Sequence, residues 1–286
     1  MIDNPVGRVL IRVYVVIFFA YLFVPLVIMG GAALNDTKFP SVYPWVGLTG
    51  RWFVDLWNDG RMWISTRNTV LVALAVVAIS LPIGTAAAIL INNLRGRTRS
   101  FLYGVMVAPI LTPGIVIGIS TLLFWNNIDV PAGLHLSVLG QCSFIIAYVM
   151  LLVLARLQNF DQGLEEAALD LGASNLQVMR RILLPYLYPA IGAAAVIAFF
   201  QSVENYNITL FTRGTADTLT VYVGSKIRTG ITPTMNALAL ILILLTVLGA
   251  ICYEVSRRRA ERQAQQESSE REALELIAQR TGEITA

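Results

Sequence analysis

The chain has 286 residues, of which 56% are hydrophobic and only 14% are charged, whereas about 25% of residues are charged in a soluble domain. The mean hydropathy of +0.66 is also that of an integral membrane protein. This composition excludes a soluble enzyme, a disordered regulator and a secreted disulfide scaffold. The net charge of +3 comes from residues between apolar runs, where membrane topology explains it better than nucleic-acid binding does.

Six stretches are long and apolar enough to cross a membrane, since a bilayer core about 30 Å thick requires roughly 20 apolar residues per helix. None of them shows the alternation of a transmembrane β-barrel. We therefore expect an all-α integral membrane protein with six transmembrane helices. The predicted spans are Val9–Leu34, Asn68–Ile91, Phe101–Trp125, Leu136–Leu157, Tyr186–Phe211 and Thr234–Val255.

The first span is uncharged over the 22 residues from Val13 to Leu34. The apolar region of a signal peptide has only about 7–15 residues, so an uncleaved helix is favoured over a cleavable signal. The loop that follows, Asn35–Arg67, is rich in Trp and Pro. We interpret its Trp side chains as interfacial anchors rather than as a binding surface.

The orientation of the spans follows from the distribution of Lys and Arg, which accumulate in cytoplasmic loops. The short loop Asn92–Ser100 contains three Arg, whereas Asn126–His135 contains none. The sequence therefore predicts that both termini are cytoplasmic and that Asn35–Arg67 is external.

The loop between the fourth and fifth spans, Gln158–Pro185, is long and patterned. Acidic residues lie near the start of a helix-forming stretch and two Arg near its end, which suits the helix dipole. Gly172 interrupts this stretch and permits a sharp turn. Around it, Leu169, Leu176 and Met179 offer apolar side chains, so the loop is suited to docking into a groove of a soluble partner.

This loop resembles the EAA motif of the permease subunits of ABC importers. In that family the motif forms the coupling helix, which sits in a cleft of the ATP-binding subunit. The family's pattern of EAA, a Gly after three residues and Ile-x-Leu-Pro after nine more is filled here by Glu166, Ala167, Ala168, Gly172, Ile182, Leu184 and Pro185.

Two further segments are similar to the shared core of that family. Asn68-Thr69 opens the second span, and Pro109 and Pro113 lie in the third. The prolines also predict kinks, because a proline removes a backbone hydrogen bond that neighbouring groups must replace.

The fifth span contains Glu204, the one acid deep within a span. An ionisable residue in a span is costly and usually faces a cavity or a partner. One helix face carries four polar residues that we expect to line a translocation path: Gln201, Glu204, Asn205 and Thr212. A structural carboxylate that pairs with an Arg or caps a helix break is the alternative.

The stretch after the fifth span is similar to the spermidine/putrescine branch of the permeases. The matching residues are Leu219, Val221, Ser225, Arg228, Gly230, Pro233, Asn236, Ala237, Leu238 and Ala239. This resemblance implies a polyamine or a similar small cationic or nitrogenous solute. Relatives of the branch carry opines, phosphonates, iron or thiamine, which stay open as alternatives, as does a secondary transporter.

The resemblance implies a type I ABC importer permease (MetI-like) core in the inner membrane of a bacterium. It divides the chain into a first helix and external loop (1–67), a five-helix core with the coupling loop 158–185 (68–256), and a charged cytoplasmic tail (257–286). The implied partners are a second, homologous permease, two ATP-binding subunits and an external substrate-binding protein.

No enzymatic or metal-binding pattern is present in the sequence. The chain lacks a Walker A motif, so the resemblance leaves ATP and Mg to the partner ATPase and no cofactor to this chain. Cys142 and Cys252 lie apart in apolar runs, and His135 is the single histidine. We interpret the cysteines as small buried hydrophobic side chains and predict no metal site.

Overall fold

The structure is a computed structural model that describes residues 5–230, 232–249, 251–252, 254–255 and 257–258. Within these residues the chain forms helices and loops, with no β-strand and one isolated bridge between Asn35 and Leu48. The chain divides into two compact units, residues 1–58 with 231–286, and residues 59–230. Most of the predicted tail, residues 259–286, lies outside the described residues.

The unit formed by the two chain ends contains α1 (Pro5–Leu34), α2 (Arg51–Trp57) and an apolar helix, Pro233–Gly249. The side chains of α1 are apolar on all sides and mostly exposed. A helix that is hydrophobic all round is typical of a membrane span.

Asn35, directly after α1, fixes the loop that follows. Its side chain donates to the carbonyls of Ser41 at 2.9 Å and Pro44 at 3.0 Å. Trp52 of α2 donates to the carbonyl of Asn35 at 2.9 Å and is only 6% exposed. Trp52 is therefore a packing residue of this unit and not the interfacial anchor that we predicted for the Trp side chains of this loop.

Three long helices form the core of the unit 59–230: α3 (Gly60–Asn93), α6 (Leu134–Leu157) and α9 (Leu184–Val203). Their buried apolar side chains join into one cluster. α3 and α6 approach each other closely at Gly84, where an added Cβ would lie 2.7 Å from Cβ of Val149. Small residues permit such close helix packing in membranes.

The predicted third span is not a continuous helix. It is divided into α4 (Gly96–Leu111) and α5 (Gly114–Asn126), which are bent by 102° relative to each other. Pro113 causes the break, because it has no N–H to donate and disfavours helical geometry in the preceding residue. Thr112 accordingly has an extended backbone, with ψ of 130°.

The predicted fifth span also ends earlier than expected. α9 ends at Val203, and a separate helix, α10 (Asn207–Thr212), follows after a break at residues 204–206. At its other end α9 continues a short helix, α8 (Asn175–Val178), through a π-helical turn at Met179–Leu183.

Four helices are long and apolar enough to cross a membrane, and the bent pair α4–α5 would make a fifth. Pro233–Gly249 is a shorter apolar helix. The described residues thus confirm an all-helical protein with several apolar helices, but not the predicted number of six.

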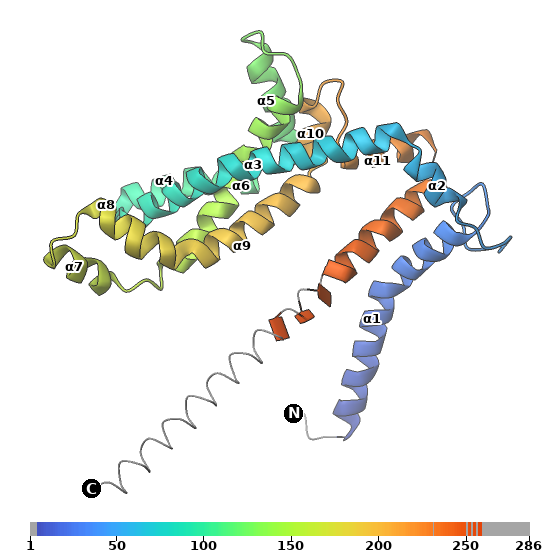
Figure 1. Cartoon of the computed structure of the whole chain (residues 1–286), viewed down its shortest axis with the longest axis horizontal. Helices are drawn as coiled ribbons and strands as arrows, with labels where there is room; N and C mark the ends of the chain where they lie inside the picture. The colour runs from blue at the N-terminus through green and yellow to red at the C-terminus, as the bar shows by residue number, and fades with distance from the viewer. Residues whose placement is uncertain (1–4, 231, 250, 253, 256, 259–286) are drawn as a thin grey trace, which may run out of the picture. The chain divides into compact units, whose positions relative to one another are not determined.

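Two short helices complete the unit 59–230, namely α7 (Gln162–Asp170) and α11 (Leu219–Thr229). Within this unit, α7 and α8 lie at one end of the α3–α6–α9 bundle, and α10 and α11 lie towards the other (Figure 1). The predicted coupling loop and the predicted path residues are therefore at different ends of the same helices.

Candidate functional sites: an acidic cavity and an exposed loop

A cavity of about 330 Å³ surrounds the break between α9 and α10. Three of the four predicted path residues line it, and they are Gln201, Glu204 and Asn205. The remaining lining residues come from the α4–α5 bend, from α6 and from the start of α10: Pro109, Ile110, Thr112, Gly114, Ile117, Phe144, Tyr148, Tyr206, Asn207 and Ile208.

Glu204 is the one charged residue among the described residues that line this cavity. It terminates α9, where its backbone N–H donates to the carbonyl of Phe200 at 3.0 Å. Its side chain is exposed, and none of the ion pairs found within the described part of the chain involves it. The carboxylate is thus available to a ligand in the cavity.

The aromatic side chains of the cavity were not predicted from the sequence. Phe144, Tyr148 and Tyr206 line it together with Glu204. The run Glu204 to Asn207, with one acid and two Asn inside an apolar stretch, was the available signal for a helix break. A carboxylate beside aromatic rings is a combination that binds cationic groups.

The structure separates Thr212 from the other predicted path residues. Thr212 is fully buried, and its hydroxyl lies 2.9 Å from the Ser137 hydroxyl and donates to the carbonyl of Ile208 at 2.9 Å. Nearby, the buried Gln141 donates to the Thr209 hydroxyl at 2.8 Å. These contacts join α10 to α6 and place Thr212 in the packing of the unit.

Glycines allow α10 to pack tightly against its neighbours. A Cβ added at Gly140 of α6 would lie 2.7 Å from Cγ2 of Ile208, and one at Gly118 of α5 would lie 3.1 Å from its Cα. One wall of the cavity is therefore held closely by α5 and α6.

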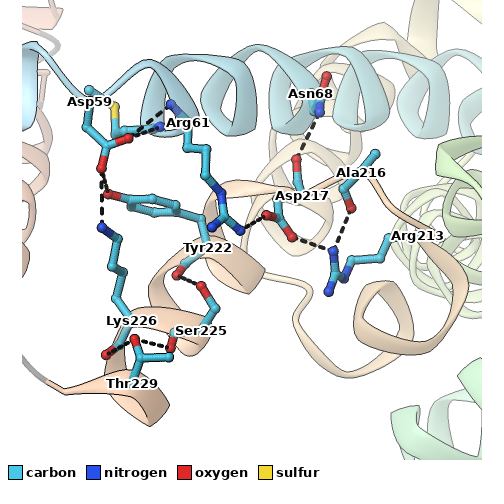
Figure 2. A network of polar contacts seen from close by, with 11 residues as sticks. Asp59, Arg61, Asn68, Arg213, Ala216, Asp217, Tyr222, Ser225, Lys226 and Thr229 are labelled. Atoms are coloured by element: carbon cyan, nitrogen blue, oxygen red, sulfur yellow. Dashed lines mark hydrogen bonds and ion pairs between the residues drawn. The ribbon is translucent and has the colours of Figure 1, made fainter.

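A polar network joins the start of α3 to residues 213–229 (Figure 2). Asp59 caps α3 and also accepts hydrogen bonds from the Tyr222 hydroxyl at 2.7 Å and from Lys226 Nζ at 3.4 Å. Asp217 pairs with Arg61 at 2.6 Å and with Arg213.

Asn68 and Thr69 belong to the same junction. The Asn68 side chain donates to the carbonyl of Asp217 at 2.9 Å, and the hydroxyl of Thr69 accepts from the N–H of Leu219 at 2.7 Å. The polar pair that opens the predicted second span thus fixes the segment before α11.

The network shifts the pKa of two of its members. Burial is the largest single influence on Asp59 and raises its pKa. Hydrogen bonds from Tyr222 and from the Met62 N–H, with the charge of Lys226, outweigh burial and bring the pKa below the usual 3.8. Burial, followed by the hydrogen bond to Asp59, raises the pKa of Tyr222 above its usual 10.0. Both shifts favour a charged Asp59 and a neutral Tyr222.

The predicted coupling loop is a helix–turn–helix. α7 ends before Gly172, whose φ is +84°. Ser174 then starts α8 with a capping box, in which its hydroxyl accepts from the N–H of Gln177 and the Gln177 side chain accepts from the N–H of Ser174. Of the predicted motif residues, Glu166 and Ala167 are exposed on α7, Ala168 is half-buried there, and Ile182, Leu184 and Pro185 lie in or after the π-helical turn.

The apolar side chains of the loop differ in part from those predicted. Leu169 and Leu176 are 40% and 57% exposed, but Met179 packs partly against the core. Leu171, which was not predicted, is 90% exposed. Exposed leucines on a helix–turn–helix form an apolar surface suited to a protein partner.

The constraint at Gly172 is its backbone conformation and not a lack of space. An added Cβ would meet no atom within 4 Å, but a residue with a side chain rarely adopts a positive φ. A cavity of about 690 Å³ is lined by α7, the end of α3, the start of α4 and the end of α6, with Glu166 and Arg95 among its lining residues.

The chain resembles known proteins over most of its length. Residues 80–264 match the family of the binding-protein-dependent transport system inner membrane component. The chain is 32% identical to the putrescine transport system permease protein PotI of Escherichia coli K12, over 92% of this chain and 96% of PotI. It is 28% identical to the spermidine/putrescine transport system permease protein PotC of the same strain, over 88% of this chain and 96% of PotC.

Solved structures show the same fold. A bacterial alginate ABC transporter in complex with an alginate pentasaccharide-bound periplasmic protein matches with a TM-score of 0.68 and 16% identity, over 86% of this chain and 91% of that chain. The inward-facing MetNI methionine ABC transporter matches with a TM-score of 0.52 and 20% identity, over 73% of this chain and 97% of that chain.

The fold, the apolar helices and the length of the family match agree with the resemblance carried by the Glu166–Pro185 motif. The prediction of an ABC importer permease most similar to the spermidine/putrescine branch is confirmed. The chain belongs to the family of inner membrane components of binding-protein-dependent transport systems.

Proposed function

We propose that this permease forms one half of the translocation path of an ATP-driven importer of small polyamines, such as putrescine or spermidine. The observation that carries the proposal is the cavity at the α9–α10 break, where the carboxylate of Glu204 lies beside Phe144, Tyr148 and Tyr206. The relatives PotI and PotC, named for putrescine and spermidine transport, support the same solute class.

The physics of the cavity suits an organic cation. Glu204 is exposed in this chain alone, and a second permease that covered the cavity would exclude water and so strengthen the attraction of the carboxylate for an ammonium group. Aromatic faces add cation–π attraction and contact for the methylene chain. The amides of Gln201 and Asn205 offer hydrogen-bond acceptors for the remaining N–H groups.

We propose that the exposed loop of α7 and α8 docks on a partner ATPase and transmits its motion. Leu171 and Leu176 supply an exposed apolar surface, and Gly172 fixes the turn between the two helices. Transport is coupled only if the solute binds the two states of the path with different affinity. ATP and Mg would then act on the partner, with this chain as the non-catalytic subunit.

The membrane arrangement that completes this proposal has six spans and two cytoplasmic termini. The bent pair α4–α5 would serve as the third span and Pro233–Gly249 as part of the sixth. The chain would then consist of a first helix and external loop (1–67), a core (68–256) and a cytoplasmic tail (257–286). A second permease, two ATPases and an external binding protein would complete the transporter.

The test compares Glu204→Gln with the wild type in the complete transporter reconstituted in proteoliposomes. The substitution keeps the shape and hydrogen-bonding capacity of the side chain and removes its charge. Uptake of labelled putrescine and spermidine should fall severalfold or more, while complex yield and the affinity of the binding protein stay unchanged. The matched control is Asp129→Asn, which removes an exposed charge outside the cavity and should leave uptake intact.

Two results would contradict the proposal. Normal polyamine uptake by Glu204→Gln would remove the carboxylate from the path. A collapse of complex yield in Glu204→Gln would instead indicate that Glu204 is paired within the assembly, because an orphaned buried partner is strongly destabilising.

A further inference from the structure

The cavity wall at residues 204–206 belongs to no helix, since α9 ends at Val203 and α10 begins at Asn207. Its position therefore depends on the elements that pack against it. On the side of α10, the contacts of Ile208 with Gly118 and Gly140 hold it closely. On the other side it contacts α11.

Three contacts join α11 to this wall. A Cβ at Gly224 would lie 2.6 Å from Cε2 of Tyr206, so only glycine lets the ring lie against the helix. Arg228 Nη2 donates to the Tyr206 hydroxyl at 3.0 Å. The Thr220 hydroxyl donates to the carbonyl of Asn205 at 3.4 Å.

α11 is itself fixed to α3 by the polar network. Tyr222 is fully buried and donates to Asp59, and the segment that leads into the helix is held by Asn68 and Thr69. Figure 2 shows that this segment is attached to α3 at two separate points: Tyr222 donates to Asp59 at the start of α3, and the carbonyl of Asp217, which precedes α11, accepts from Asn68 further along α3. α11 is thus attached to α3, and Tyr206 packs against α11.

We propose that Tyr206 is a positioning residue of the cavity and that Gly224 and Arg228 of α11 hold its ring in place, so that α11 sets how accessible the cavity is. Tyr206 lines the cavity, and the edge of its ring contacts Gly224 of α11. A displacement of α11 then moves the cavity wall directly. This inference rests on the proposed function in one respect, namely that the cavity is part of the translocation path.

The test measures access to the cavity without any transported solute. Thr112 lines the cavity from the α4–α5 bend, and Thr112→Cys introduces a thiol of similar size. In the complete transporter, with Cys142→Ala and Cys252→Ser in this chain, the rate of modification by 2-aminoethyl methanethiosulfonate is followed by mass spectrometry of this chain.

Removing the hydrogen bond should free the ring and open the cavity. Arg228→Ala and Tyr206→Phe should each raise the modification rate at least about threefold. The double variant should show no more than the larger single effect, because both substitutions remove the same contact; such non-additivity is expected of residues in direct contact.

Gly224→Ala should act in the opposite direction, because the added Cβ pushes the ring into the cavity and lowers the rate. The matched control is Gly192→Ala on α9, where an added Cβ meets no atom within 4 Å and the rate should stay unchanged. If Gly224→Ala prevents assembly, the Arg228 and Tyr206 variants still decide the question.

Unchanged rates in the Arg228 and Tyr206 variants, at equal complex yield, would overturn the proposal. Effects that multiply in the double variant would overturn it as well, since Arg228 would then act on something other than Tyr206. A transporter that shows the expected labelling but takes up no polyamine would contradict the proposed solute and not the role of Tyr206.

Discussion

Replacement of Asp59 by Ala removes a helix cap and two side-chain contacts at once, and the structure allows its cost to be worked out. The carboxylate caps α3 by accepting from the N–H groups of Arg61 at 2.9 Å and Met62 at 3.2 Å, and the loss of such a cap costs about 1 kcal/mol. It also accepts from the buried Tyr222 hydroxyl, which would be left without an acceptor at a cost of about 1–3 kcal/mol. The partly exposed Lys226 contact adds little. We therefore expect a loss of about 2–4 kcal/mol in the unit 59–230.

The assay is thermal unfolding of the purified complex. A loss of 1 kcal/mol lowers the melting temperature by about 2–4 °C in a domain of 150–250 residues, so Asp59→Ala should melt several degrees below the wild type. Tyr222→Phe keeps the cap and should cost about 1.5–3 kcal/mol, the net contribution of a hydrogen bond to a charged group. In the Asp59→Ala background it should cost less, because its acceptor is already gone.

The pH dependence of stability has a defined sign. Because the pKa of Asp59 is lowered in the folded protein, its contribution is fully present above the usual carboxyl pKa of 3.8 and is lost as the pH falls through the lower, folded value. Asp59→Asn should therefore lose less stability than the wild type when the pH falls below about 4. The raised pKa of Tyr222 acts oppositely, with a contribution that is present at neutral pH and is lost only in strong alkali.

The reasoning about Asp59 would be refuted by an Asp59→Ala complex that melts within about 1 °C of the wild type. It would also be refuted if Tyr222→Phe lowered the melting temperature equally in the presence and absence of Asp59. Asp129→Asn, which removes an exposed acid, is the control and should leave the melting temperature unchanged.

Two further predictions concern the loop and the topology. Gly172→Val should abolish solute-stimulated ATP hydrolysis by the complete transporter at normal yield, because a β-branched residue cannot adopt a φ of +84°. Gly172→Asn should retain most of this activity, because Asn tolerates the same conformation. Equal activity of the two variants would refute the conformational argument. In a background without Cys142 and Cys252, an impermeant maleimide should label Ser41→Cys from outside and Ser100→Cys only after permeabilisation, and the reverse pattern would overturn the charge-based orientation.

The features of this protein that could be predicted from the sequence are those encoded locally. Long apolar runs predicted the helical class, and the Glu166–Pro185 motif predicted the family. The bend between α4 and α5 was predicted only as a kink. Its angle of 102° depends on how α5 packs against α10 through Gly118 and Ile208, and such a non-local contact is not visible in a single sequence.

The residues that line the cavity were predicted in part, for a physical reason. Glu204 stands out in the sequence because a charge in an apolar span is costly. Thr212 was placed on the same face because the helix of the fifth span was assumed to run without a break as far as Thr212. Because the helix breaks at residues 204–206, the side chains of α10 no longer follow the rotation of 100° per residue that continues from α9. Thr212 therefore faces Ser137 instead.

The unbroken run of α8, the π-helical turn and α9 has a mechanical consequence. These 29 residues, Asn175–Val203, span about 43 Å at 1.5 Å per residue. One end of this rod, Asn175, lies three residues after Gly172, and the other end, Val203, directly precedes Glu204. By simple lever geometry over that length, a tilt of about 5° about one end displaces the other by about 4 Å, which is comparable to the width of an ammonium group. A small tilt of the rod at the loop would therefore displace the Glu204 carboxylate by a distance similar to the size of the solute's ammonium group.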